Sequence, residues 1–336
     1  MTYLVLRFSS IGNVAMLVPL IASLSENYPE DRFVVVCEKR LGDLFFGMSN
    51  VESVAYEGLR RRGDNTNLFK RLRKQYHIDA VIDLQDTFHT HLLRFMFRFC
   101  GAKVVSVMPN RIRKFFLCQC GGRWRKPLQT ETERYRSALR RAGLVAGDDF
   151  SSLPVNQQAA DAVGKRFGVK KGRWIGVAPF AKHKTNRLDY QTMKEVLEQL
   201  SKSVAEDGGR VFLFGAGDVE CEMLLQWASI YRHTQSVAGQ LSLAEELELM
   251  RRLDVMLCMD SANQHLASLV GLRVVSVWCG THPKSGFYGW KQNPKDCLQK
   301  NLSCRPCTIH GKETCRFRNF RCKEINAEQI MKLIAK

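Results

Sequence analysis

The chain has 336 residues, 45% of them hydrophobic, and its 51 lysines and arginines against 33 aspartates and glutamates give a formal charge of +18. This length exceeds what one core usually organises, so we expect two domains. No apolar run reaches the roughly 20 residues of a membrane span, and Met1 leads into a strand rather than a signal peptide, so we expect a cytoplasmic protein and not an integral membrane protein. Its 12 cysteines are then expected to be mainly reduced thiols.

Apolar strands alternate with helical stretches through the first half of the chain. We expect strands at 3–8, 33–37, 51–55, 80–84 and 103–107, with helices near 14–25, 67–76 and 89–99. This alternation is typical of a parallel sheet with helices on both faces, an α/β fold.

The second half repeats the pattern. A polar helix after Pro154 precedes expected strands at 174–178, 210–214, 255–258 and 274–278. We place a domain boundary near residue 160, which gives domains 1–160 and 161–322. We expect a last helix around 327–335, in a terminal segment 323–336. Packing of this segment on the first domain is one possible arrangement.

Each half has its own loop chemistry. Ser9-Ser10-Ile11-Gly12-Asn13 follows the first strand, where Gly12 can turn sharply and leave the serine hydroxyls and backbone amides facing a ligand. In the second half, the turn at 214–220 contains Gly-Ala-Gly, whose glycines allow close approach by a nucleotide. A simple connection between a strand and a helix would need the same residues.

The segment 259–269 changes from an apolar strand to a helix, with Asp260 or Ser261 as the expected N-cap. Unpaired N–H groups at the helix start, together with the positive end of the helix dipole, predict a phosphate site. His265, about one turn into the helix, can point at the same place. An ordinary capped helix with a hydrogen-bonded histidine is the alternative.

Basic residues cluster mainly in the first 130 residues. The clusters are 60–62, 70–74, 111–114, 123–126 and, in the tail, 316–318. Any one of them can be a solvated face. Their bias toward one half favours an N-terminal domain that meets an anionic surface, such as phosphorylated glycolipid at the inner membrane. The positive charge is the only feature that would support nucleic-acid binding. Because no nucleic-acid-binding module is recognised in the sequence, we expect no nucleic-acid partner.

Two motifs carry a resemblance over nearly the whole chain. The opening 4–13 resembles R-F-S-S-I-G-D, and 260–283 resembles D-S-A/G-x-x-H-L-A followed by a G-x-T-x-P turn, both typical of the heptosyltransferases that add ADP-activated heptose to lipopolysaccharide. The resemblance implies a GT-B fold, two Rossmann-like domains facing each other across a cleft. It also implies an inverting, metal-independent transfer of heptose or a related sugar from an ADP-sugar to a lipopolysaccharide-core or similar acceptor, with no further cofactor.

The resemblance also implies roles for individual residues. By position, Glu220 or Asp218 resembles the acidic contact to the ribose, and Leu241 lies in the segment that resembles the lining of the base pocket. The family's diphosphate-binding lysine aligns with Asn186, so Lys184 or Arg187, close by, is expected to supply the positive charge. The remaining donor-site candidates are Ser9, Ser10, Gly12, Asp260, Ser261, Ala262 and His265.

The general base is the most serious departure from the family pattern. Asn13 stands where the family has an aspartate, and a carboxamide orients a hydroxyl without accepting its proton. Asp86, after another strand of the same domain, is a substitute; it can also be the N-cap of a helix that begins near Phe88. We therefore expect either an altered transferase or a homologue that binds a nucleotide or glycan without transferring it.

The tail contains Cys304-x2-Cys307, then Cys315 and Cys322. Four thiolates can close a structural zinc site. Irregular spacing and the resemblance, which carries no assigned metal there, favour reduced thiols that pack a loop. We expect no metal.

Overall fold

The computed structural model describes residues 1–56, 64–119 and 126–336. They form two compact units, described separately here: unit 1 is Met1–Asn110 with Gln129–Pro154, and unit 2 is Arg111–Leu128 with Val155–Lys336. The basic cluster 60–62, and 123–125 of the cluster 123–126, lie outside the described residues.

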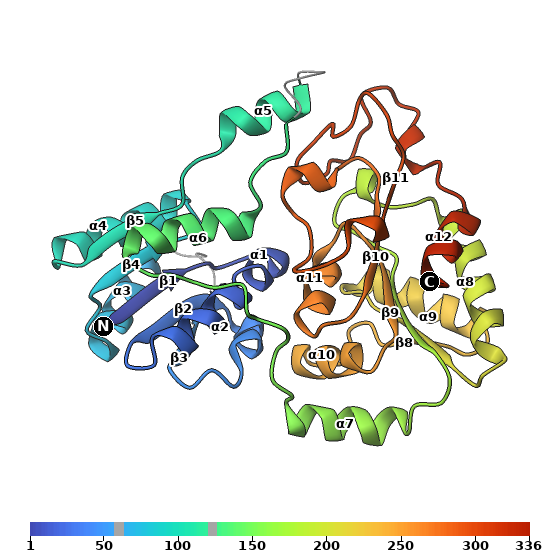
Figure 1. The fold of residues 1–336 in the computed structure, drawn as a ribbon, viewed down its shortest axis with the longest axis horizontal. Helices are drawn as coiled ribbons and strands as arrows, with labels where there is room; N and C mark the ends of the chain where they lie inside the picture. The colour runs from blue at the N-terminus through green and yellow to red at the C-terminus, as the bar shows by residue number, and fades with distance from the viewer. Residues whose placement is uncertain (57–63, 120–125) are drawn as a thin grey trace. The chain divides into compact units, whose positions relative to one another are not determined.

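Unit 1 contains one parallel sheet in the order β3-β2-β1-β4-β5 (Figure 1). Its strands are β1 (Thr2–Leu6), β2 (Arg32–Glu38), β3 (Val51–Tyr56), β4 (Ala80–Asp83) and β5 (Lys103–Ser106). Its helices are α1 (Ile11–Ala15), α2 (Val18–Asn27), the 3-10 helix η1 (Lys39–Phe45), α3 (Asp64–Gln75), α4 (Phe88–Phe99) and α6 (Glu131–Ala142). The strands at the centre are almost continuously apolar, as expected for a parallel sheet covered on both faces.

Helices α3 and α4 lie side by side on one face of this sheet. Phe69 of α3 meets Phe97 of α4 with ring centroids 4.8 Å apart, and both helices pack on alternate residues of the strands, among them Leu4 and Val34. Helix α6 packs elsewhere, where the Thr132 hydroxyl donates to the Met16 carbonyl at 3.3 Å.

Unit 2 contains a second parallel sheet in the order β11-β10-β9-β6-β7-β8. Its strands are β6 (Trp174–Ala178), β7 (Arg210–Leu213), β8 (Thr234–Ser236), β9 (Val255–Met259), β10 (Val274–Trp278) and β11 (Cys297–Gln299). Its helices are α5 (Arg111–Gln119), α7 (Gln157–Phe167), α8 (Tyr190–Ala205), α9 (Asp218–Ile230), α10 (Leu243–Arg251), α11 (Ala262–Leu269) and α12 (Ala327–Ile334), with 3-10 turns η3 (Lys184–Asn186), η4 (Pro283–Ser285), η5 (Pro294–Asp296) and η6 (Arg321–Lys323).

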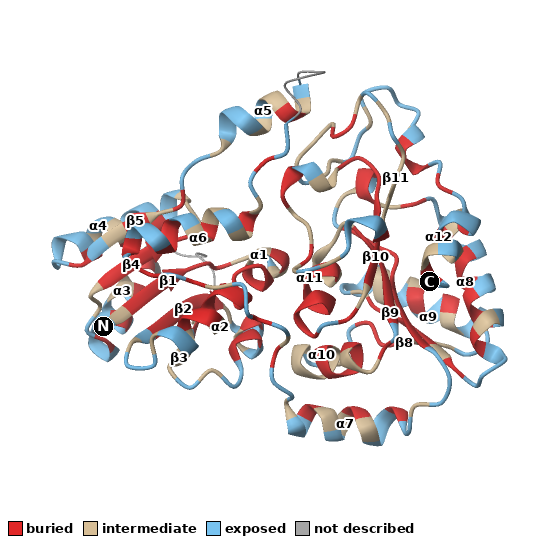
Figure 2. Ribbon diagram, viewed as in Figure 1, coloured by how far each residue is buried: buried red, intermediate tan, exposed pale blue. Residues whose placement is uncertain are grey.

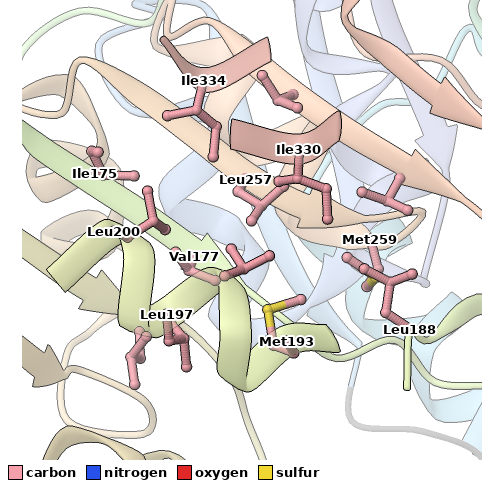
Figure 3. Close-up of a cluster of buried hydrophobic side chains, with 14 of the residues drawn as sticks. Ile175, Val177, Leu188, Met193, Leu197, Leu200, Leu257, Met259, Ile330 and Ile334 are labelled. Atoms are coloured by element: carbon pink, nitrogen blue, oxygen red, sulfur yellow. The ribbon is translucent and has the colours of Figure 1, made fainter. Parts of the chain in front are cut away.

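The last helix lies in unit 2. Figure 3 shows Ile330 and Ile334 of α12 directed at the same core as Leu257 of the sheet and Leu200 of α8, and all four side chains are buried there. The apolar face of α12 completes the core of unit 2, so this segment packs there and does not join the first domain.

Most expected elements form, and their ends differ by a few residues. The helix expected at 14–25 is divided into α1 and α2, with Pro19 near the start of α2, where its missing N–H costs nothing. Helix α5, which the sequence shows only as a basic cluster, groups with unit 2 and not with the first domain. Strands β8 and β11 have three residues each, too few for a periodic signal.

No helix of the described residues is both long and apolar enough to cross a membrane.

Both sheets reverse their strand order once. In unit 1 the reversal lies between β1 and β4, and in unit 2 it lies between β6 and β9. At such a point the connections leave the neighbouring strands in opposite directions, which opens a crevice at their carboxyl ends where α/β proteins bind ligands. The candidate residues after these four strands are therefore brought together in pairs of loops.

Candidate functional site

Helix α11 begins directly after β9 with its first turn uncapped. Ser261 occupies the N-cap position, but its side chain makes no cap hydrogen bond. Its Oγ is buried without a hydrogen-bond partner among the described residues, and so is Nδ1 of His265 one turn further on. Buried polar atoms normally have partners. These two atoms, together with the first-turn N–H groups from Ala262 onward, which have no acceptor within their own helix, are therefore suited to binding a polar ligand.

Asp260 gathers three side chains beside this helix start. Its Oδ1 accepts a hydrogen bond from Gln264 Nε2 at 3.0 Å, and its Oδ2 accepts from Thr281 Oγ1 at 2.6 Å and from Asn186 Nδ2 at 3.4 Å. Of the two expected N-caps, Ser261 takes the position, whereas the Asp260 oxygens are occupied by these three side chains. The carboxylate instead ties α11 to the loops after β6 and β10.

Burial controls the protonation of this pair. Burial raises the pKa of Asp260 to about 6, although the hydrogen bonds from Thr281 and Gln264 lower it. Burial lowers the pKa of His265 to about 4, so the imidazole is neutral at physiological pH. A neutral histidine can donate from one nitrogen and accept at the other.

The loop after β6 carries the two expected cations, Lys184 and Arg187, and they differ in exposure and in their contacts. Asn186 is buried and touches Asp260, whereas the Lys184 ammonium is exposed and lies 5.9 Å from the Phe320 ring centroid. Arg187 donates to the Ala181 carbonyl and forms an ion pair of 3.5 Å with Glu220. Of the two expected cations, Lys184 is therefore the one exposed to solvent.

Glu220 lies on the first turn of α9, after the Gly-Ala-Gly turn. Burial raises the pKa of its carboxyl, and the Ala216 N–H and Arg187 oppose this. Asp218 begins α9 and is exposed. Leu241, just before α10, is partly buried, and no interaction of the described residues joins it to the other candidates.

The tail contributes backbone to the site, which the sequence does not reveal. Asn186 Nδ2 donates to the His310 carbonyl at 3.2 Å, and Thr185 exchanges hydrogen bonds with Lys312 through its N–H at 3.0 Å and its hydroxyl at 2.9 Å. Gly311 has φ +103°, and a Cβ there would lie 2.7 Å from His183 Cβ. Only glycine allows this close approach without displacement.

Two further residues organise the site. Thr281, from the G-x-T-x-P turn, is fully buried, and its carbonyl accepts from Arg305 at 2.6 Å. Arg305 is itself buried and also donates to the Trp278 carbonyl at 2.7 Å, so its guanidinium holds the end of β10 and the following turn together. Thr281 could be found from the motif, whereas Arg305 had no signal beyond the cysteine run around it.

In unit 1, the loop after β1 differs from the expected turn. Gly12 is buried within α1 and not at a sharp bend, so α1 begins immediately after Ser10, its N-cap. Asn13 Nδ2 donates to Ser10 Oγ at 3.2 Å, and the Asn13 carbonyl accepts from Tyr135 Oη at 3.5 Å. Ser9 precedes the helix and is half-buried.

Asp86 is not a helix cap. Thr87 is the N-cap of α4, whereas Asp86 has φ +50°, an uncommon backbone state for a residue other than glycine. Its Oδ1 lies 3.0 Å from His91 Nε2 and 3.8 Å from an Arg94 nitrogen. Because β4 is next to β1, Asp86 and Asn13 follow neighbouring strands at the reversal of the first sheet.

The four tail cysteines and Cys118 line one cavity of about 390 Å³ in unit 2. Within the described ranges, however, no three histidine, cysteine or acidic side chains are arranged as metal ligands would be. The absence of zinc therefore stays a prediction.

The sequence profile of glycosyltransferase family 9 (heptosyltransferase) matches residues 65–319. This stretch includes Asp86 and Asp260 with its partners Gln264, Thr281 and Asn186. It leaves out the loop that contains Asn13. The chain belongs to glycosyltransferase family 9.

Solved structures of this family share the fold. A glycosyltransferase family 9 protein from Veillonella parvula is 15% identical with a TM-score of 0.75, over 99% of this chain and 96% of that one. E. coli ADP-heptose lps heptosyltransferase II is 17% identical with a TM-score of 0.70, over 100% and 98%. E. coli heptosyltransferase WaaC, solved with ADP, is 14% identical with a TM-score of 0.68, over 100% and 99%.

The two Rossmann-like units therefore make up a GT-B fold, as predicted. A search of curated protein sequences gives no significant match.

Proposed function

We propose that this family 9 glycosyltransferase takes its sugar from an ADP-sugar, of which ADP-heptose is the first candidate. The start of α11 supports this most strongly, because Ser261 Oγ and His265 Nδ1 are buried beside an uncapped helix turn and have no hydrogen-bond partner in the described part of the chain. A diphosphate placed there receives backbone N–H donors and the positive end of the helix dipole. WaaC has been solved with ADP-2-deoxy-2-fluoro heptose, at 14% identity and a TM-score of 0.67.

The proposed reaction is an inverting displacement. An acceptor hydroxyl attacks the anomeric carbon, the bond from that carbon to the diphosphate breaks, and ADP leaves with the electron pair. The developing charge on the diphosphate is stabilised by the α11 start and the exposed Lys184, and such electrostatic stabilisation is usually the largest catalytic contribution. We propose that this protein cation and the helix dipole balance the charge without a bound metal or other cofactor.

Unit 1 is proposed to supply the base. Asp86 accepts the hydroxyl proton, and Asn13 orients the hydroxyl. Two observations support Asp86. Its carboxylate does not cap α4 and lies 3.0 Å from His91 Nε2, which can position it. It also follows β4, the strand next to β1, and Asn13 follows β1. The acceptor is proposed to be an anionic glycolipid such as a lipopolysaccharide core, in keeping with the charge of +18.

A second candidate function is nucleotide or glycan binding without transfer. It is favoured by two neutral side chains, Asn13 and Asn186, where the family pattern has an aspartate and a lysine. Hydrolysis of an ADP-sugar by water distinguishes the two, because a protein that only binds the donor leaves it intact.

Calorimetric titration with ADP and UDP tests the donor assignment. We expect ADP to bind more tightly than UDP, and Asp260→Ala and His265→Ala to weaken ADP binding by about tenfold or more, since each removes a polar group from the site. Asp161→Ala on the exposed surface of α7 makes the same charge change as Asp260→Ala and should have no effect on ADP binding. Tighter UDP binding, or ADP binding that neither substitution alters, would contradict the proposal.

A further inference from the structure

Helix α4 turns its most apolar side chains to solvent. Four of them form the α4 stripe: Phe88, Leu92, Phe95 and Phe99, which are 80%, 42%, 66% and 87% exposed. Their spacings of four, three and four residues place them within an arc of roughly 60° on the helix. A surface helix normally directs such a stripe to the core, but here Thr90, Leu93 and Phe97 occupy the buried face. Figure 2 shows the exposed positions along α4.

Basic side chains flank the α4 stripe on one side. His91, Arg94 and Arg98 line a cavity of about 330 Å³ between α4 and the edge strand β5, together with Phe95, Val104 and Ser106. Arg94 is paired with Asp83 at 3.4 Å, and Asp86 lies 3.0 Å from His91 and 3.8 Å from Arg94. Arg98 has no carboxylate partner among the described residues. Helix α4 itself contains no aspartate or glutamate. Arg98 therefore provides a positive charge for an anion beside the apolar surface.

The neighbouring helix adds positive charge. Helix α3 packs against α4 through Phe69 and Phe97. Its exposed basic residues are Lys70, Arg71, Arg73 and Lys74. Arg71 donates to the Ala55 carbonyl of β3 at 2.6 Å, which leaves Lys70, Arg73 and Lys74 as further exposed cations on the helix next to α4.

We propose that α4 is an interfacial helix that docks unit 1 on an anionic lipid bilayer. The α4 stripe enters the boundary between headgroups and acyl chains, as phenylalanine and leucine do on amphipathic helices that lie in a membrane surface. Arg98 and the α3 cations contact lipid phosphates, and the long arginine and lysine side chains can reach the headgroups from beside the stripe.

A second copy of the chain is the competing occupant, because the spacing of the stripe is also that of a coiled-coil seam. Self-pairing of α4, however, would flank the seam with Arg94 and Arg98 from both copies and with no acidic residue of α4 to pair them. The flanking charge therefore favours anionic lipid. This inference concerns unit 1 alone and does not depend on the proposed sugar transfer.

Flotation with vesicles tests the proposal on the full chain without nucleotide. We expect binding to vesicles of phosphatidylcholine with phosphatidylglycerol, weakened by salt, and little binding to phosphatidylcholine alone. Phe95→Ser with Phe99→Ser should lower vesicle affinity by about tenfold or more, and Arg98→Gln by about fivefold. Matched controls in unit 2 are Val169→Ser with Ile230→Ser, 82% and 64% exposed, and Arg232→Gln, which changes the charge equally.

Loss of binding in the α4 variants, with the controls and the thermal unfolding unchanged, supports the proposal. Absence of binding to anionic vesicles overturns it, as does equal binding by wild type and α4 variants. A dimer in light scattering that Phe95→Ser with Phe99→Ser dissociates, without any vesicle binding, overturns it in favour of a second copy.

Discussion

Thr281 Oγ1 donates a hydrogen bond of 2.6 Å to Asp260 Oδ2, which joins the turn after β10 to the residue that follows β9. Thr281 is fully buried, so this hydrogen bond lies inside unit 2 and not on an exposed loop. The geometry of the candidate donor site therefore depends on a contact between the loop after β10 and the loop after β9.

Thr281→Val tests this contact. Valine keeps the shape and removes the donor, so one buried carboxylate oxygen loses its shortest hydrogen bond, and we expect a loss of about 1.5–3 kcal/mol in the free energy of unfolding. ADP affinity should fall as well, since Asp260 is less well held. Denaturant titration and calorimetry measure the two effects. The control for ADP affinity is Thr234→Val in β8, which removes a hydroxyl that donates to the Arg232 carbonyl.

The pKa of Asp260 predicts a pH dependence of stability. The pKa is raised from 3.8 to about 6 on folding, so the folded state binds the proton more tightly than the unfolded chain. The stabilisation by protonation is complete below about pH 4 and is lost as the pH rises through 6. Relative to Asp260→Asn, the wild type should therefore lose about 1–3 kcal/mol between pH 4 and 7. A difference between the two proteins that is flat with pH would contradict the raised pKa.

Asp86→Asn tests the proposed base. General base catalysis is typically worth about 10²–10⁴-fold, so transfer or donor hydrolysis should fall by that factor while ADP affinity is retained. Asn13→Asp should add little if Asp86 already accepts the proton. A large gain in turnover from Asn13→Asp would instead show that the native chain lacks a base. Turnover that neither substitution changes would remove both carboxylates from the mechanism.

The sequence predicts the local parts of this site better than the distant ones. The α11 start was predictable because the strand, the N-cap position and His265 lie within one short segment. The contact of Asn186 with Asp260 joins residues 74 positions apart and depends on β6 lying next to β9. Strand order is a property of the packed sheet, so no local pattern reveals it.

Two errors have the same origin. Gly12 was expected at a turn and Asp86 as a possible cap because single residues were compared with their usual roles. In the structure α1 begins one residue before Gly12, and Thr87 caps α4 in place of Asp86. When a helix begins one residue earlier or later than expected, a different residue becomes the N-cap or the turn residue. The ends of helices are the least certain part of a sequence-based prediction.

Cys315 is predicted to be the most reactive tail thiol. Burial raises the pKa of this thiol, but N–H groups from Phe320, Phe317, Asn319 and Arg318 together bring it below its usual value. Burial raises the pKa of Cys322 to about 11. Because the thiolate is the nucleophile, limited alkylation followed by peptide mass spectrometry should modify Cys315 before Cys322. The reverse order would contradict the assignment.

Elemental analysis tests the prediction of a metal-free tail. We expect well under one zinc per chain in purified protein, because the tail cysteines are not grouped as ligands in the described residues. Stoichiometric zinc that Cys307→Ser removes would show a structural metal site in the tail cavity.

The close fit of Gly311 against His183 and Asn186 limits how this protein can be recombined with its relatives. Residues 183–186 and 310–312 lie far apart in the sequence, yet each supplies the other's hydrogen bonds. A chimaera that exchanges only the loop after β6, for instance to restore a lysine at position 186, would leave the His310 carbonyl facing a side chain of different shape. The two segments must be exchanged as one unit if donor specificity is to be transplanted between family members.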